Sequence, residues 1–154
     1  MNFTFSVFEK TRGFFKSYLE QLSLEDLNKI PKGFNNNIIW NIGHIVATEQ
    51  VLIYKLSGLP MLVSDEFINA YRKGSKPEGN VTQDDVDVIA KMLSETIQKT
   101  KTDYNENAFL NFQEYTPETT GTTLHNVDDA LDFALFHEGI HLGIVMSLLK
   151  TVKL

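Results

Sequence analysis

The chain of 154 residues contains no cysteine. This absence excludes a disulfide scaffold, a zinc ribbon, an iron–sulfur site and a cysteine nucleophile, because each of these needs a thiol group. A bound metal ion would therefore have to take its ligands from histidine, aspartate or glutamate.

Positive charge and long apolar runs are also scarce. The 14 Lys and Arg residues stand against 20 Asp and Glu residues, which gives a net charge of −6 without a basic run. Nucleic-acid-binding proteins need a positive surface to displace counterions, so the composition disfavours a DNA or RNA partner. The longest apolar run, near Leu142–Leu149, is far shorter than the ~20 residues that span a bilayer. We therefore expect a cytoplasmic protein with no membrane partner.

Proline is rare, and its positions mark the ends of helical blocks. All four prolines lie between stretches that have apolar residues at helical spacing, so none interrupts such a stretch. The four stretches cover approximately residues 5–22, 35–58, 82–104 and 126–150. The last three open on residues typical of a helix start: the asparagines at 35–37, Thr82 with Asp85 as an acidic capping box, and Asn126. The second closes at Gly58, a residue typical of a helix end. The sequence therefore predicts four amphipathic helices.

Four amphipathic helices in a chain of this size predict an all-α four-helix bundle in a single domain over residues 1–154. The segment 107–115 is the one candidate for a strand, and we interpret it as a loop. The joint over residues 59–81 is long for a bundle connection and contains a short predicted helix, Asp65–Arg72. A joint of that length can run along the bundle, so the second and third helices could be parallel.

Two of the four histidines lie four residues apart, at His137 and His141. This spacing puts both imidazoles on one helix face, close enough to bind a single ion. The rest of that face is apolar, and a buried unpaired polar group costs about 1–3 kcal/mol. A metal ion would offset this cost of burial for both imidazoles at once. The alternative is that each imidazole forms a hydrogen bond with a neighbouring helix.

A third ligand has to come from another helix, and His44 is the candidate. It lies in the middle of the second predicted helix, beside its main aliphatic stripe. Three histidines from two helices would leave one or more coordination positions for water or substrate. His125 lies in a threonine-rich loop before the fourth helix, and we interpret it as a solvated or capping residue.

The segment His137–His141 also fits the His-Glu-x-x-His signature of zinc proteases. Only 13 residues follow His141, and none of them is His, Glu or Asp, so the downstream third ligand is missing. Proteolysis is therefore disfavoured. Three interpretations of Glu138 remain: it is a general base, a partner that orients an imidazole, or a buried structural carboxylate.

Two charged residues interrupt apolar stripes, Arg12 in the first helix and Glu49 in the second. If these helices are antiparallel, both residues lie about 15–18 Å from the end that the helices share. We predict an Arg12–Glu49 ion pair inside the bundle; the alternative is that each side chain reaches solvent separately. Gly139 and Gly143 lie on the side of the helix away from the histidines. We expect either that they allow close packing against another helix or subunit, or that the bundle tolerates the cost of two glycines within a helix.

Three segments together resemble the DinB-like superfamily of metalloenzymes: Ile39–Ile45 (IWNIGHI), Tyr71–Pro77 (YRKGSKP) and Phe136–Gly143 (FHEGIHLG). The resemblance extends over most of the chain. It implies a four-helix bundle of up-down-down-up topology with a long crossover between the second and third helices. It also implies a divalent ion, usually zinc or nickel, bound by three histidines, which by motif match are His44, His137 and His141.

The resemblance further implies an activity and an assembly. Characterised members transfer a low-molecular-weight thiol, such as bacillithiol, mycothiol or glutathione, to an electrophile, and related enzymes isomerise maleylpyruvate; dimers are common. A metal-bound thiol is deprotonated, and because this chain has no cysteine, the thiol would have to be a cosubstrate. We expect a small-molecule substrate and a homodimer. The alternatives are a non-catalytic metal- or ligand-binding bundle of the stress-response type, a metal-dependent hydrolase, and a purely structural bundle.

Overall fold

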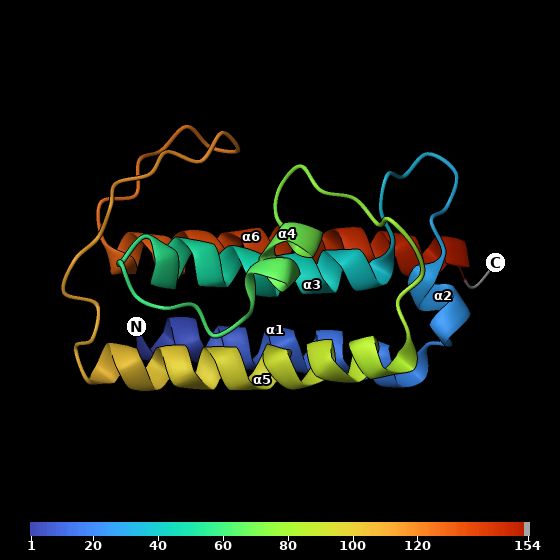
Figure 1. Ribbon diagram of the computed structural model, residues 1–154, viewed down its shortest axis with the longest axis horizontal. Coiled ribbons are helices and arrows are strands. Elements are labelled where there is room, and N and C mark those ends of the chain that lie inside the picture. Colours follow the sequence, from blue (N-terminus) through green and yellow to red (C-terminus); the bar gives the residue numbers. More distant parts are fainter. Residues whose placement is uncertain (153–154) are drawn as a thin grey trace.

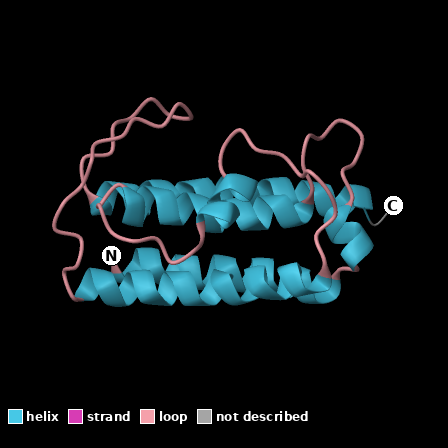
Figure 2. Cartoon of the chain, in the orientation of Figure 1, coloured by secondary structure: helices cyan, strands magenta, loops and turns pink. Residues whose placement is uncertain are grey.

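The computed structural model describes residues 1–152, and over this range the chain is helical without a strand (Figure 2). A single isolated bridge pairs Tyr115 with Leu124. The helices are α1 (Asn2–Gln21), α2 (Leu24–Asn28), α3 (Ile38–Glu49), η1 (Gln50–Lys55), α4 (Asp65–Tyr71), α5 (Gln83–Asn105) and α6 (Val127–Val152). The predicted all-α class is confirmed.

The four longest helical segments lie side by side (Figure 1). Helix α3, which continues into η1, packs against α6 and α5, and α1 packs against α5 and α6. In the view of Figure 1, α1 and α6 run towards one end of the molecule, and α3 and α5 run towards the other. The helix that carries His44 is thereby the neighbour of the helix that carries His137 and His141.

The helix ends follow the capping residues that the sequence predicts. The Asn37 side chain accepts a hydrogen bond from the Trp40 backbone N–H at 2.9 Å at the start of α3. Thr82 and Asp85 form a capping box at the start of α5. Gly58 has a φ of +71°, the left-handed conformation that suits a glycine after a helix.

Two features of the helices differ from the prediction. The second helix is not α-helical throughout, because Gln50–Lys55 forms the π-helix η1. Helix α2 was not predicted, since its five residues are too few to show a helical period. It starts where the Ser23 side chain accepts a hydrogen bond from the Asp26 backbone N–H at 3.1 Å.

The core consists of two apolar clusters with a buried polar layer between them. One cluster contains Phe15 and Ile42, and the other contains Phe8 and Ile53. Arg12 lies between Phe8 and Phe15 on α1 and is only 2% exposed. The clusters therefore meet around a buried cation.

Four helices contribute to this polar layer. Arg12 donates hydrogen bonds to Glu49 at 3.1 Å, to Glu138 at 2.7 and 2.8 Å, and to the Thr96 hydroxyl at 2.8 Å. Glu49 also accepts hydrogen bonds from Thr96 at 2.8 Å and from Thr100 at 2.6 Å. The predicted Arg12–Glu49 pair is confirmed, and the alternative of separate solvation is wrong. The second carboxylate, Glu138, was not predicted as a partner.

One side of α6 is exposed although it is apolar. Phe136 and Met146 are about half exposed. A Cβ atom placed on Gly139 or Gly143 would have no described atom of another helix within 4 Å. Close packing of these glycines against another helix of the same chain is therefore wrong.

By length and composition, α6 could cross a membrane, and 33% of its most apolar 18-residue window is buried. Core helices of soluble proteins pass the same test, so this property does not distinguish the two cases.

Candidate metal centre

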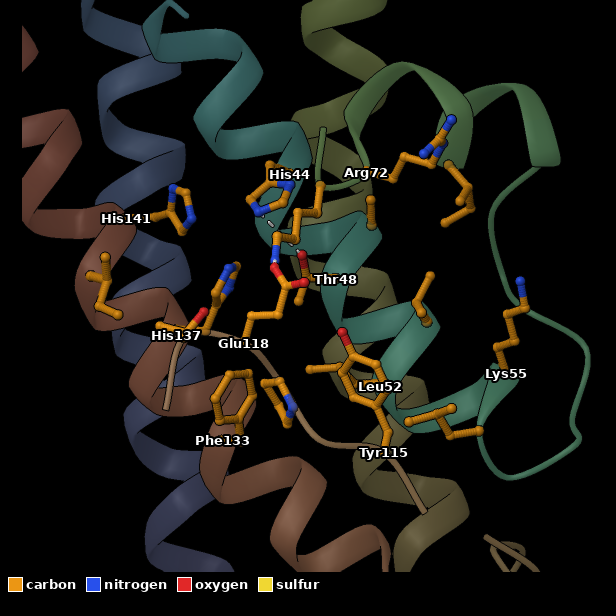
Figure 3. Close-up of a pocket in the computed structure, with 18 of the residues that line it drawn as sticks. His44, Thr48, Leu52, Lys55, Arg72, Tyr115, Glu118, Phe133, His137 and His141 are labelled. Carbon is orange, nitrogen blue, oxygen red and sulfur yellow. Dashed lines mark hydrogen bonds and ion pairs between the residues drawn. The ribbon is translucent and has the colours of Figure 1, made fainter. Parts of the chain in front are cut away.

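A cavity of about 600 Å³ opens between α3, η1, α4, α6 and the loop that joins α5 to α6 (Figure 3). Much of its wall is apolar and includes Ala47, Val51, Leu52, Ile68, Phe133 and Ile140. Two of the histidines and two of the basic residues lie on different sides of the cavity. His137 and His141 of α6 lie on the side opposite Lys55 and Arg72 (Figure 3).

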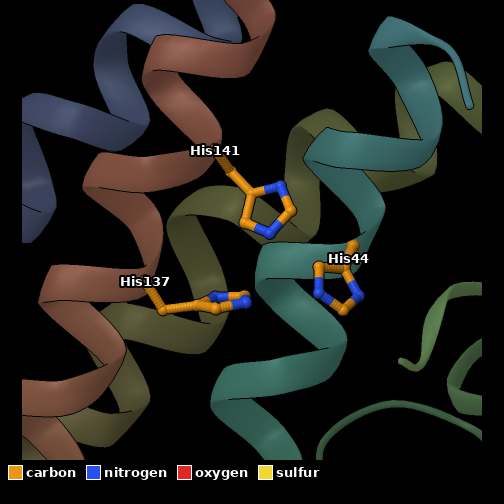
Figure 4. Close-up of side chains that lie close together, drawn as sticks. All are labelled: His44, His137 and His141. Carbon is orange, nitrogen blue, oxygen red and sulfur yellow. The ribbon is translucent and has the colours of Figure 1, made fainter. Parts of the chain in front are cut away.

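The three predicted metal ligands come together at this cavity. His44, His137 and His141 each offer a ring nitrogen, and these three atoms lie within 4.8 Å of one another. The centroids of the three rings are 4.5–5.0 Å apart. Figure 4 shows the rings gathered in the space between α3 and α6. Two helices distant in sequence therefore build one cluster of imidazoles.

The His44 imidazole is held on its outer side by a backbone carbonyl. Its Nδ1 lies 2.6 Å from the carbonyl oxygen of Tyr71. A carbonyl only accepts, so Nδ1 carries the hydrogen and Nε2 keeps a lone pair. The Trp40 ring stacks on the imidazole, with centroids 4.7 Å apart and planes 11° apart. Both contacts fix the ring. Nε2, which lies 3.4 Å from the Thr48 hydroxyl, is the nitrogen that can act as a ligand.

Gly43 allows the Tyr71 carbonyl to reach His44. A Cβ atom on Gly43 would lie 2.5 Å from the Tyr71 ring, a distance that side chains cannot adopt. The absence of a side chain thus lets the last residue of α4 rest on α3. A glycine at position 43 avoids a clash with the residue whose carbonyl holds His44.

The His141 imidazole is held by an amide side chain of α3. Its Nδ1 lies 2.8 Å from Oδ1 of Asn41. The Asn41 amide nitrogen donates to the carbonyl oxygen of Asn37 at 2.7 Å and to Oδ1 of Asn36 at 3.0 Å. These two bonds determine which way the amide faces, so Oδ1 is the acceptor and His141 Nδ1 the donor. His141 therefore also keeps its lone pair on Nε2.

All three imidazoles resist protonation. Burial lowers the pKa of His44, that of His137 to about 4 and that of His141 to about 3, and for the last two the neighbouring histidines lower it further. The rings are thus neutral at neutral pH. A cluster of three neutral imidazoles with two fixed tautomers has the donor set that zinc and nickel accept, so these residues fit a divalent metal ion.

Glu138 lies in the polar layer rather than in the cavity wall. One of its oxygens accepts both hydrogen bonds from Arg12. Burial raises its pKa to about 7, which the charge of Arg12 only partly offsets. This placement favours the interpretation of Glu138 as a buried structural carboxylate.

His125 lies apart from the other histidines. Its ring is exposed, and Nδ1 lies 2.9 Å from a carboxylate oxygen of Glu114. Its backbone N–H donates to Asp129 at 2.8 Å near the start of α6. These contacts agree with the predicted solvated or capping role.

Several residues around the centre were not predicted. The sequence does place Asn41 three positions before His44, but the orientation of its amide depends on Asn36 and Asn37. Lys73 and Glu118 line the cavity and form an ion pair. They come from segments without helical periodicity, so no pattern indicates that they meet.

Comparisons with known proteins agree with the motif resemblance. The family model of the DinB superfamily matches residues 8–145, which include all three histidines of the cluster. Among curated proteins, none matches the chain. A match over so much of the sequence establishes the family: this chain belongs to the DinB superfamily.

Proposed function

We propose that this protein is a metal-dependent enzyme that transfers a low-molecular-weight thiol to an electrophile. The divalent ion, zinc or nickel, would be bound by His44, His137 and His141. The observation that carries the proposal is the cluster of three neutral imidazoles, with ligand atoms within 4.8 Å of one another, at the wall of a cavity of about 600 Å³. A cavity of that volume accommodates a small molecule next to the cluster.

A divalent ion held by three neutral imidazoles acts as a Lewis acid and lowers the pKa of a coordinated thiol. The chain has no cysteine, so the sulfur nucleophile has to arrive with a substrate. The apolar wall of Val51, Leu52 and Phe133 would reduce the amount of water near the reacting sulfur. The hydrogen bonds of Tyr71 and Asn41 would keep two of the ligand rings in place.

The position of Glu138 supports a transferase over a hydrolase. A hydrolase of the His-Glu-x-x-His type uses the glutamate as a base for a water molecule at the metal. Here the Glu138 carboxylate is bound by Arg12 and lies outside the cavity lining.

We further propose a domain organisation, an assembly and a location for the whole chain. We propose a single domain over residues 1–154 and the up-down-down-up topology, supported by the helix directions in Figure 1 and the long joint before α5. The exposed apolar side of α6, with Phe136 and Met146, supports a homodimer. The net charge of −6 supports the absence of a nucleic-acid partner. We also propose a cytoplasmic location without a membrane partner.

Thiol consumption by metal-loaded protein tests the function. Zinc- and nickel-loaded protein would be incubated with cysteine, glutathione or bacillithiol and the electrophile 1-chloro-2,4-dinitrobenzene, and thioether formation would be followed by absorbance. We expect turnover with at least one thiol, and loss of turnover in the variant His137→Ala. Metal binding without turnover for any thiol would instead favour a non-catalytic metal-binding bundle.

A further inference from the structure

The cavity differs in charge from the protein as a whole. The chain carries 20 acidic residues and 14 Lys and Arg residues. The cavity lining has the opposite excess, with three cations (Lys55, Arg72 and Lys73) and one carboxylate (Glu118). Cations gathered at one cavity of an acidic protein attract a negatively charged ligand to that place.

The one carboxylate of the lining is bound by one of these cations. Glu118, from the loop between α5 and α6, forms an ion pair with Lys73, which follows α4. The two side chains are 83% and 65% exposed. Water screens such a pair, so the pair adds little to the stability of the fold and can be exchanged for another.

Glu118 and the three histidines line the same cavity. Figure 3 shows Glu118 among the side chains that line this cavity, together with His137 and Thr48. A carboxylate group that enters the cavity with a ligand would meet the same cation, Lys73. The protein's own carboxylate thus occupies a position that suits a ligand carboxylate.

We propose that Lys73, assisted by Arg72 and Lys55, binds the carboxylate of a substrate, and that Glu118 occupies this place until the substrate displaces it. The ligand class is a small thiol that carries a carboxylate. This inference rests on the proposed function for the thiol, because the sulfur at the histidines would hold the carboxylate at high effective concentration near Lys73. Lys73 is then a specificity-determining residue, and Glu118 is an internal competitor.

A matched pair of ligands tests the carboxylate site without an activity assay. Protein loaded with cobalt(II) would be titrated with 3-mercaptopropionate and with 3-mercaptopropionamide, and binding would be followed by the thiolate-to-cobalt absorption band. A charge-assisted contact predicts about tenfold tighter binding of the acid than of the amide. Equal affinities of the two ligands would overturn the inference.

Three variants test whether Lys73 and Glu118 cause the preference for the acid over the amide. Lys73→Met should abolish the preference for the acid without changing the affinity for the amide. Glu118→Gln should strengthen binding of the acid severalfold and leave the amide unchanged, because the competitor is lost. Lys91→Met, which alters an exposed lysine of α5 paired with Glu95, is the control and should change neither affinity. An unchanged preference in Lys73→Met would overturn the inference.

A second ligand pair separates this inference from the proposed function. Metal-free protein would be titrated with 4-phenylbutyrate and 4-phenylbutyramide by calorimetry. A preference for the acid that depends on Lys73 supports the carboxylate site even if no thiol binds to cobalt, in which case only the thiol proposal fails. If no thiol binds to cobalt, absence of that preference in this assay overturns the carboxylate site.

Discussion

At the scale of single residues, the candidate metal centre depends on the groups that hold its three histidines. Asn41 and the Tyr71 carbonyl each accept a hydrogen bond from Nδ1 of a histidine and leave Nε2 free to bind metal. The spacing of His137 and His141 is visible in the sequence because a helix has a fixed period. The roles of Asn41 and Tyr71 are not visible, since they depend on how α3, α4 and α6 pack.

Removal of the Asn41 amide should weaken metal binding. In Asn41→Ala, His141 loses its acceptor and its ring is free to turn, so we expect affinity for zinc to fall about 10- to 100-fold. Competition with a chromophoric chelator measures this change. Asn105→Ala, at the exposed end of α5, serves as the control. Equal affinities of Asn41→Ala and the control would contradict the role of Asn41.

The low pKa values of the histidines predict acid sensitivity of the metal-free protein. In the unfolded chain a histidine gains its proton near pH 6.5, whereas His137 and His141 do so in the fold only at about 4 and about 3. The unfolded state therefore binds more protons between these values, and stability falls as the pH drops from 6.5 towards 4. Each histidine contributes a slope of up to about 1.4 kcal/mol per pH unit.

Urea unfolding at pH 7, 6 and 5 measures this slope. We expect a shallower loss of stability in His137→Gln, because one of the two groups is gone. His125→Gln is the matched control: its pKa in the fold is raised by Glu114, so its removal should not make the loss shallower. A slope that is the same in wild type and His137→Gln would contradict the burial of a neutral imidazole.

At the scale of elements, the short helix α4 completes the centre from outside the four long helices. Its last residue, Tyr71, rests on Gly43 of α3 and supplies the carbonyl for His44. The sequence predicts a short helix over Asp65–Arg72, within one residue of the observed α4, and the structure shows that the Ser64 side chain caps its start. The sequence does not predict where α4 docks, since no period links residues 43 and 71.

A side chain at Gly43 should displace α4. In Gly43→Ala the new Cβ would lie 2.5 Å from the Tyr71 ring, and we expect a destabilisation of about 1–3 kcal/mol together with weaker metal binding. In the Tyr71→Ala background the same substitution should cost much less stability, because the clash is gone. Thermal and chemical unfolding measure both effects.

Gly13→Ala is the control for helix propensity. Nothing lies within 4 Å of a Cβ at Gly13, so this change in α1 should be neutral or stabilise by up to about 1 kcal/mol. A cost of Gly43→Ala that is the same with and without the Tyr71 ring would contradict the proposed contact.

At the scale of the whole molecule, the polar layer joins α1, α3, α5 and α6 at one level. The helical rise and an antiparallel arrangement are enough to predict that Arg12 meets Glu49, because both lie at the same height. They are not enough to predict Glu138, since that contact depends on which faces of α1 and α6 meet. The layer carries one cation and two carboxylates, which agrees with the raised pKa of Glu138.

Loss of the cation should destabilise the whole fold. Arg12→Met leaves Glu49 and Glu138 buried without a positive charge, which costs about 3–5 kcal/mol. Adding Glu138→Gln should recover part of this loss, because one of the two carboxylates becomes neutral. Lys91→Met, which breaks the exposed pair with Glu95, should change stability by less than about 0.5 kcal/mol. Urea unfolding measures all three, and equal costs of Arg12→Met and Lys91→Met would contradict the role of the layer.

The central claim is that three histidines bind one divalent ion, and a zinc titration tests it most directly. Calorimetric titration of metal-free protein should show one site per chain in wild type and in His125→Ala. The variants His44→Ala, His137→Ala and His141→Ala should each bind zinc at least about 100-fold more weakly, because two imidazoles do not complete the donor set. A wild-type protein that binds no zinc or nickel, or single variants that bind as tightly as wild type, would contradict the account.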